Sequence, residues 1–318
     1  MYTLKKIIYY IISLFFSLII TILFLELYVR LIVDDGFNYE LEMMKYANTI
    51  KITKKINDQK VFLHKPNFEA TIMRAKIKID QNGYRYKYNV NDNDKIIMLL
   101  GDSMTFGFGS NFTFADYLQE SFGNDYKIMN TGVGNTNTIM QEKSFFKYHK
   151  IHNPKILILN FFINDLEVIE AQEKSFIKRY FYSFSYISYK YKIIKLKLKK
   201  NLSFKKYYKK TFQNKENLDK VFLSIQKLQQ YSDKNDIKFF VHFIPELHDL
   251  KNYPFINEHN IIKNFLIKKN IKFIDGVNYL KNSDESNLLV SIEDAHANET
   301  AHTLMGEYLL KFIYQEIL

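Results

Sequence analysis

Four short stretches of the chain contain side chains that could together cleave an ester. In chain order these are Gly101-Asp102-Ser103, Gly132-Val133-Gly134-Asn135, Asn164-Asp165 and Asp294-Ala295-His296. They supply a serine hydroxyl, N–H donors from backbone and amide groups, and a carboxylate next to an imidazole. A serine that attacks an acyl carbon needs a base, a group that orients this base, and donors for the negative charge that develops on oxygen. We therefore interpret the four stretches as parts of one candidate site.

Ser103 is the candidate nucleophile. It follows the apolar run Lys95 to Leu100 by three residues, where the chain turns from a strand toward a helix. A serine in that place lies in the positive field of the helix N-terminus, beside N–H groups without a helical acceptor. A Gly-Asp-Ser turn that only caps a helix is the competing interpretation. We interpret Asp102 as a structural loop residue rather than the catalytic acid, because adjacent side chains in a tight turn diverge.

Gly132, Gly134, Asn135 and Asn164 are the candidate donors to an oxyanion. A glycine-rich turn lets a backbone N–H approach a substrate closely, and the amide of an asparagine is a neutral donor. Preorganised donors of this kind are usually the largest catalytic contribution, and the loss of one lowers the rate by about 10²–10³-fold. The competing interpretations are a tight turn for the glycines and a helix cap for Asn164.

His296 is the candidate general base. It is one of eight histidines, and it has Asp294 two residues before it and a long amphipathic pattern just after it. A carboxylate must fix the tautomer of the base and stabilise its imidazolium form; we choose Asp294, with Glu293 as the alternative. His302 lies within the helical pattern and is interpreted as structural. The two histidines lack partners at metal-ligand spacing, and the chain has no cysteine, so we expect no metal and no other cofactor.

Alternating apolar runs and helical patterns must position these residues. The runs are typical of strands covered on both faces; they are Lys95 to Leu100, Tyr126 to Met129, Lys155 to Phe162, Ile237 to Ile244 and Ile271 to Ile274. The best helical patterns are Thr113 to Phe122, Thr138 to His149, Leu218 to Gln230 and Glu299 to Ile317. Such alternation predicts an α/β fold, with a parallel sheet between two layers of helices. In such sheets the working residues follow the C-terminal ends of the strands. The four stretches follow this rule or, like Asp294-Ala295-His296, lie in the loop before the last helix.

The N-terminus is predicted to be a membrane anchor. Ile7 to Leu25 is a run of 19 residues without a charge, long enough to cross the roughly 30 Å hydrocarbon layer of a bilayer as a helix. Lys5 and Lys6 precede the run and acidic residues follow it from Asp34. The positive-inside rule therefore places the N-terminus in the cytoplasm and the remainder outside. A cleaved signal peptide is the alternative, but Leu25 to Val33 offers no small-residue cleavage site.

Length and composition suggest how the chain is divided. Its 318 residues exceed one typical domain of about 100–200 residues. We expect an anchor over residues 1–33, a linker and small β-rich lead-in over 34–92, and the catalytic domain over 93–318. In the lead-in, the alternation of Ala75 to Asp80 and the following Asn82-Gly83 predict a hairpin that returns through Tyr84, Arg85 and Tyr86. No chemistry is assigned to the lead-in.

A basic insertion is expected within the catalytic domain, at residues 173–215. Lys174 to Lys210 contains twelve lysines and one arginine but no acidic residue, and tyrosine and phenylalanine are interleaved with them. The segment follows the third strand, near the expected mouth of the site. A solvated helical insertion is one interpretation; contact with an anionic surface, of lipid headgroups or an acidic polymer, is the other. Nucleic acid is not expected as a partner outside the cytoplasm.

The four stretches resemble the conserved blocks of the SGNH/GDSL hydrolases. The matching segments are Gly101 to Gly107, Asn130 to Thr138, Asn164-Asp165 and Asp294 to Asn298. The resemblance covers about Lys95 to Leu318. It implies a flavodoxin-like three-layer α/β/α arrangement of the parallel five-stranded sheet.

The resemblance also implies the composition of an oxyanion hole. Its donors would be the backbone N–H of Ser103, one backbone N–H of the second block and the side chain of Asn164. Aligned without gaps from Asn130, the family's donor glycine falls on Asn135, with Gly134 as the alternative.

The sequence thus predicts a single-pass, membrane-anchored serine ester hydrolase of the carboxylesterase or deacetylase type, facing outward. The resemblance implies that Ser103 is the nucleophile, His296 the base and Asp294 its partner. The expected substrate is an acylated surface glycan or a lipid-linked saccharide, cleaved through an acyl-serine intermediate. An O-acyltransferase that uses the same triad and a catalytically inactive surface-assembly protein are the alternatives.

Overall fold

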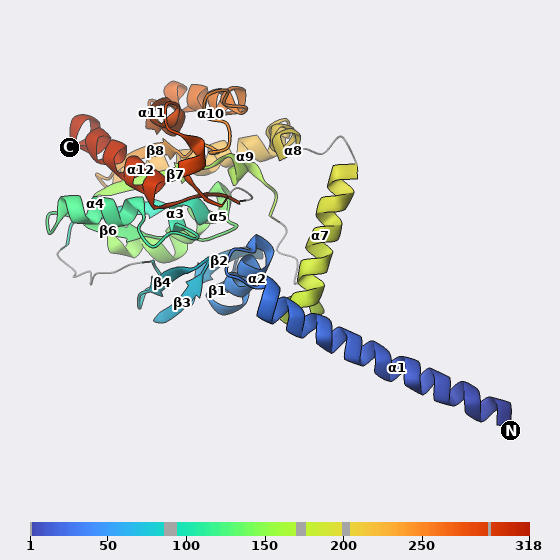
Figure 1. The fold of residues 1–318 in the computed structure, drawn as a ribbon. Coiled ribbons are helices and arrows are strands. Elements are labelled where there is room, and N and C mark those ends of the chain that lie inside the picture. The colour runs from blue at the N-terminus through green and yellow to red at the C-terminus, as the bar shows by residue number, and fades with distance from the viewer. Residues whose placement is uncertain (1, 86–93, 170–175, 199–203, 292–293) are drawn as a thin grey trace.

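The computed structural model describes residues 2–85, 94–169, 176–198, 204–291 and 294–318. Figure 1 shows one long helix that projects from a body built around a central sheet. This helix, α1 (Tyr2–Tyr28), continues into the π-helical turn η1 (Val29–Val33). Its side chains are exposed along the whole uncharged run, and it is long and apolar enough to cross a membrane. A bilayer would remove this exposed apolar surface from water.

The body contains a five-stranded parallel sheet. In spatial order the strands are β6 (Lys127–Asn130), β5 (Ile96–Leu100), β7 (Ile156–Phe161), β8 (Lys238–Phe243) and β9 (Lys272–Asp275). In chain order this is the 2-1-3-4-5 arrangement of flavodoxin-like sheets. Every residue of β5 and β7 is buried, which explains their continuous apolar runs. The five predicted strands and the predicted fold class are confirmed.

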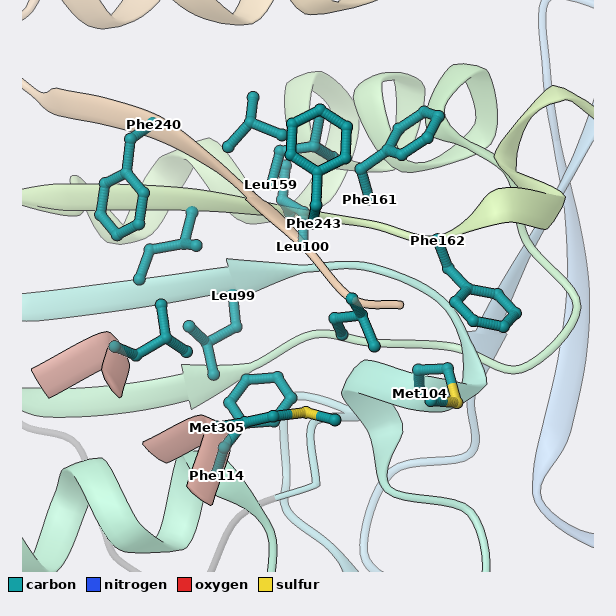
Figure 2. Packing of buried hydrophobic residues seen from close by; sticks show 14 of the residues in the cluster. Leu99, Leu100, Met104, Phe114, Leu159, Phe161, Phe162, Phe240, Phe243 and Met305 are labelled. Carbon is teal, nitrogen blue, oxygen red and sulfur yellow. The ribbon is translucent and has the colours of Figure 1, made fainter. Parts of the chain in front are cut away.

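Helices cover both faces of this sheet and complete the three layers (Figure 1). On one face lie α4 (Phe114–Phe122), α11 (Gly276–Leu280) and α12 (Glu299–Phe312); on the other lie α5 (Thr138–Ser144), α9 (Lys215–Lys234) and α10 (Ile256–Lys268). The four predicted helices correspond to α4, α5, α9 and α12. Figure 2 shows Phe114 and Met305 packing on one side of the strands, with Phe161 and Phe243 on the other. This continuous apolar core holds the strand ends, and hence the candidate site, in place.

The lead-in before the sheet consists of a helix and two antiparallel hairpins. These elements are α2 (Tyr39–Thr49), β1 (Lys51–Ile56) with β2 (Gln59–His64), and β3 (Phe68–Ile72) with β4 (Ala75–Ile79). The helix α2 was not anticipated from the sequence.

The predicted hairpin of the lead-in is only partly correct. The strand at Ala75 to Asp80 is present, but its main partner β3 precedes it in the chain. The reason is the Met73-Arg74 pair, in which both residues have a positive φ and so close a two-residue turn. On the other side of Asn82-Gly83, Arg85 adds a single bridge to Ile79, and Tyr86 lies outside the described residues.

Three helices form the described part of the predicted basic insertion, between β7 and α9. They are α6 (Phe176–Tyr180), α7 (Tyr182–Leu198) and α8 (Phe204–Phe212). Lys174 and residues 199–203 lie outside the described part of the chain. In Figure 1, α7 stands apart from the sheet; it starts beside the end of α1 and leads toward α8.

Candidate active site

Ser103 is the first residue of the short helix α3 (Ser103–Phe106), just beyond the end of β5. Asp102 is the N-cap of this helix and accepts a hydrogen bond of 2.9 Å from the Met104 N–H. The turn requires Gly101, because a Cβ there would lie 1.9 Å from the hydroxyl oxygen of Thr105. The N–H of Ser103, at the first helical position, has no acceptor within the helix. A hydroxyl and an N–H donor therefore lie together at the C-terminal edge of the sheet.

Arg85 holds the loop that follows α3. Its buried guanidinium donates hydrogen bonds to the carbonyl oxygens of Phe106, at 2.8 Å, and of Gly107 and Ser110. Burial lowers the pKa of Arg85 to about 10, which leaves the group charged at neutral pH. The cation thus exchanges water for three carbonyls of one loop and fixes the chain around Ser103. The sequence analysis did not assign this positioning role to Arg85.

Ser103 and His296 lie within hydrogen-bond distance, although 193 residues separate them in the chain. The Ser103 Oγ is 2.8 Å from the His296 Nε2, and the His296 Nδ1 is 2.5 Å from the Asp294 Oδ1. Asp294 and His296 both belong to β11 (Asp294–Ala297), and side chains two residues apart on a strand share a face. The structure thus brings together the three residues predicted as a triad. Glu293, the alternative acid, lies outside the described residues.

Strand β11 is itself held at both ends. It pairs antiparallel with β10 (Leu289–Ser291). Directly after it, Asn298 caps α12 by accepting a hydrogen bond of 3.1 Å from the Ala301 N–H, and its amide donates to the Leu289 carbonyl at 3.2 Å. The sequence pattern around His296 therefore serves to fix the strand that carries the base.

Aromatic rings enclose the imidazole of His296. Tyr39 stacks on it with ring centroids 6.0 Å apart, and Phe108 packs at 4.9 Å. Burial alone would lower the pKa of His296, but the negative charge of Asp294 and its hydrogen bond raise the pKa above the ordinary value. The environment thus stabilises the imidazolium that forms when this histidine accepts a proton. With Nδ1–H directed at Asp294, Nε2 is left to accept the Ser103 hydroxyl.

Asn164 lies in the 3₁₀ turn η4 (Ile163–Leu166), after the end of β7. Its amide nitrogen donates a hydrogen bond of 3.0 Å to the Asp102 Oδ2. An amide nitrogen carries two hydrogens, so this contact fixes the amide and leaves one N–H for a ligand. Asp102 therefore has two structural roles, because its Oδ1 caps α3 while its Oδ2 orients Asn164. A structural role for Asp102 was predicted, but its contact with Asn164 could not be read from the sequence.

Asp165, the neighbour of Asn164, is fully buried and stabilises η4 through its hydrogen bonds. Its two carboxylate oxygens accept hydrogen bonds from the Phe162 N–H, at 2.8 Å, and from the Gln141 side chain, at 3.0 Å. Burial and the nearby charge of Asp102 raise the pKa of Asp165 well above the ordinary value. This residue supports the turn that carries Asn164 and is not one of those that line the cavity at Ser103.

The second predicted block, residues 132–135, differs from the other three in that none of its residues lines the cavity at Ser103. The N–H of Gly134 donates a hydrogen bond of 2.8 Å to the hydroxyl of Tyr46, which in turn lies 2.7 Å from the His64 Nε2. Asn135 is exposed, with a left-handed φ of 59°. Neither Gly134 nor Asn135 is among the residues that line the cavity at Ser103. The Gly134 N–H is thus already bonded to the hydroxyl of Tyr46. The role of Asn135 as an oxyanion donor stays a prediction.

A cavity of about 600 Å³ opens over Ser103, His296 and Asn164. This volume is in the range of small-molecule sites. Its outer walls come from segments distant in the chain and carry aromatic and charged side chains, namely Tyr39, Tyr189, Lys205, Tyr208, Glu246 and His248. None of these six residues was predicted from the sequence to belong to the site. Three of them lie in the insertion that was expected near the mouth of the site.

Glu246 and His248 form a second carboxylate–imidazole pair on this cavity. The buried Glu246 contacts the His248 Nδ1 and also accepts a hydrogen bond of 3.3 Å from the His248 N–H. Both residues follow the end of β8 (Lys238–Phe243), so the strand-end argument applied to the other blocks would have found them.

Among the described residues, no group of three or more histidine, aspartate or glutamate side chains is arranged to hold a metal ion. The groups around Ser103 are a hydroxyl, an imidazole, a carboxylate and the amide of Asn164. A hydroxyl in contact with an imidazole that is paired with a carboxylate is an arrangement suited to nucleophilic chemistry.

No protein-family model matches the chain, and no curated protein matches it. Solved structures with a similar shape include a lipase/acylhydrolase from Enterococcus faecalis, with 15% identity, a TM-score of 0.45, and coverage of 69% of this chain and 95% of that one. A catalytic mutant of an acetylxylan esterase from Geobacillus stearothermophilus is also similar, with 12% identity, a TM-score of 0.45, and coverage of 71% and 96%. At such identities and TM-scores these likenesses carry no conclusion about activity, and the fold assignment rests on the strand order.

Proposed function

We propose that the protein is a serine ester hydrolase. The observation that carries this proposal is the continuous pair of contacts from Ser103 Oγ to His296 Nε2, at 2.8 Å, and from His296 Nδ1 to Asp294, at 2.5 Å. A base oriented by a carboxylate and in contact with a hydroxyl is the arrangement that activates a serine. The cavity above this hydroxyl is large enough to admit an acyl group and part of its carrier.

In the proposed reaction, Ser103 Oγ attacks the carbonyl carbon while its proton passes to His296 Nε2. Asp294 stabilises the imidazolium. The oxyanion is bound by the Ser103 N–H and by the Asn164 N–H that is not engaged with Asp102. Collapse of the tetrahedral intermediate expels the alcohol, which takes the proton from His296 and leaves an acyl-serine. Water, deprotonated by His296, then attacks the acyl-serine; as the second tetrahedral intermediate collapses, His296 returns this proton to the Ser103 Oγ and the carboxylic acid is released.

We infer that the carrier of the acyl group is a carbohydrate. Tyr39, Tyr189 and Tyr208 line the cavity, and aromatic rings are surfaces on which sugar rings stack. Glu246, His248 and Lys205 add groups that can bond to sugar hydroxyls. The same site also suits an O-acyltransferase, since the pair formed by Glu246 and His248 provides a second imidazole that could take a proton from an acceptor hydroxyl.

We also propose that the catalytic body faces away from the cytoplasm. Lys5 and Lys6 precede the uncharged run of α1, whereas Asp34 and Asp35 follow this run. A reporter that is active only outside the cytoplasm, fused at residue 40, should be active. A silent outer reporter together with an active cytoplasmic reporter at the same place would reject the orientation.

Hydrolysis is tested with the full-length protein in detergent and a small aryl acetate. Ser103→Ala should lose activity, whereas Ser121→Ala, an exposed serine on α4, should retain it. Equal turnover by Ser103→Ala would reject the mechanism. Candidate sugar acceptors added to the same assay separate the two reactions, because transfer yields an acylated sugar and hydrolysis yields only free acid.

A further inference from the structure

One face of α7 exposes a row of apolar side chains. Phe184, Ile187, Tyr191 and Ile194 are 43%, 51%, 66% and 56% exposed. They are spaced by three, four and three residues, so they lie on one side of the helix. We call these four residues the exposed row. A row of large apolar side chains on the outside of a body marks an interaction site.

The opposite face of α7 packs against the body. Tyr182 and Tyr186 contact a small cluster that includes Val29 of η1 and Met44 of α2. One turn beyond Tyr186, Tyr189 lines the cavity over Ser103. The helix therefore separates the cavity from the exposed row, and whatever covers the row lies next to the site.

The start of α7 is bound to the end of the membrane-spanning helix. Glu26 accepts hydrogen bonds from the N–H groups of Tyr182, at 3.0 Å, and Ser183, at 2.9 Å, and from the Ser183 hydroxyl, at 2.7 Å. Arg30 donates to the Tyr180 carbonyl at 2.9 Å and lies over the Tyr182 ring at 4.0 Å. These contacts fix the first turn of α7 at the level where α1 leaves the bilayer. The rest of α7 leads away from the line of α1 (Figure 1).

The charges around the exposed row suit an anionic surface. Lys190 and Lys195 are exposed on the same helix, on either side of the row. In the preceding α6 (Phe176–Tyr180), Phe176 and Ile177 are exposed together with Lys178. Aromatic and aliphatic side chains flanked by lysines are typical of helices that lie in the headgroup layer of a membrane.

We propose that α6 and α7 lie on the membrane surface from which α1 emerges, with the exposed row among anionic lipid headgroups. Tyr189, on the other side of the same helix, then places the cavity beside the lipid surface. The acylated saccharide would accordingly be one that is attached to a membrane lipid; this second part rests on the proposed ester hydrolysis.

The chain contains no tryptophan, so a single introduced indole reports its own depth. Full-length Ile187→Trp and Ile267→Trp proteins are reconstituted into vesicles of phosphatidylcholine and phosphatidylglycerol with brominated acyl chains. Ile267, 64% exposed near the end of α10, is the matched control on the body. Bromine should quench the indole at 187 several-fold more than the indole at 267. Equal, weak quenching at both would overturn the proposal, as would an indole at 187 that is shielded from aqueous iodide but not quenched by lipid, since a protein would then cover the row.

A second assay tests the attachment of the substrate independently. In the same vesicles, turnover of a soluble aryl acetate is compared with turnover of an acetylated sugar linked to a lipid. Ile187→Glu should lower the ratio of lipid-linked to soluble turnover several-fold, because a carboxylate in the row is repelled from anionic headgroups. An unchanged ratio would overturn the lipid-linked substrate. If Ser103→Ala kept both activities, the proposed ester hydrolysis would be rejected. The quenching result would still hold, because it does not depend on the reaction.

Discussion

His296 and His302 are six residues apart and both buried, but their surroundings have opposite effects on their protonation. His296, in β11, faces Asp294, whose charge and hydrogen bond raise the histidine's pKa despite burial. His302, in α12, packs against the ring of Phe114, and burial lowers its pKa to about 3, with the charge of Arg85 acting in the same direction. The difference between the two pKa values comes from the carboxylate: Asp294 offsets the effect of burial at His296, whereas burial and neighbouring positive charge both lower the pKa of His302. Of the two histidines, His296 is the one whose surroundings favour the protonated form.

Replacing each histidine separately should have the largest effect and tests the comparison most strongly. His296→Ala is expected to lower kcat for an aryl acetate by about 10⁶-fold, as loss of the base of a serine triad does. His302→Ala, which removes an equally buried ring, should stay within a few-fold of the parent enzyme. The measurement is steady-state kinetics on both variants, with circular dichroism to confirm folding. Comparable losses in two folded variants would remove the distinction between base and structural histidine.

Two asparagines extend the comparison to the oxyanion. Asn164→Ala should lower kcat by about 10²–10³-fold, because the donor oriented by Asp102 is lost. Asn135→Ala keeps its backbone N–H and has an exposed side chain, so its kcat should change by less than about threefold. Single-turnover acylation rates are the appropriate measurement. If Asn164→Ala kept the rate of the parent enzyme, the Asn164 amide would not be a donor to the oxyanion.

The sheet and part of the site could be predicted from physical patterns in the sequence. Buried parallel strands leave continuous apolar runs, and the residues at their C-terminal ends share one edge, which places Ser103 near Asn164. His296 lies in β11, outside this sheet, and its pairing with Ser103 was predicted from the nearby Asp294 and from the resemblance of the four stretches to a known set of blocks. Contacts made by the lead-in could not be predicted. Tyr39 reaches His296, and Tyr46 occupies the Gly134 N–H, 88 residues away in sequence, yet neither tyrosine lies in a local pattern that differs from an ordinary helix.

The pH dependence of the reaction tests the raised pKa of His296. Its base form is required for attack, so kcat/KM should rise with pH through a midpoint above the ordinary histidine value of about 6.5. Asp294→Asn removes the charge that raises the pKa; burial then dominates, and the midpoint should move below that of the parent enzyme while the maximal rate falls. A midpoint unchanged by Asp294→Asn would show that another group, such as Glu293, sets the pKa.

The smallest expected effect is on the pH dependence of stability, through the buried and neutral His302. Its pKa is lowered to about 3 in the folded state, so the unfolded chain binds the extra proton first as the pH falls below about 6.5. His302 then costs up to about 1.4 kcal/mol of unfolding free energy for each pH unit below that value. His302→Leu, which cannot be protonated, should flatten the acid loss of stability by that slope. The free energy of unfolding of both proteins is measured with denaturant at pH 7 and pH 5. An equal loss of free energy between these pH values in the two proteins would contradict the lowered pKa of His302.

The most direct test of the account is covalent labelling of the full-length protein with a serine-directed fluorophosphonate, followed by peptide mass spectrometry. One adduct is expected, on the peptide that contains Ser103, and it should be lost in His296→Ala, where the hydroxyl is no longer activated. Hydrolysis of an aryl acetate by a protein that is labelled at another residue, or not labelled at all, would contradict the claim that Ser103 is the nucleophile.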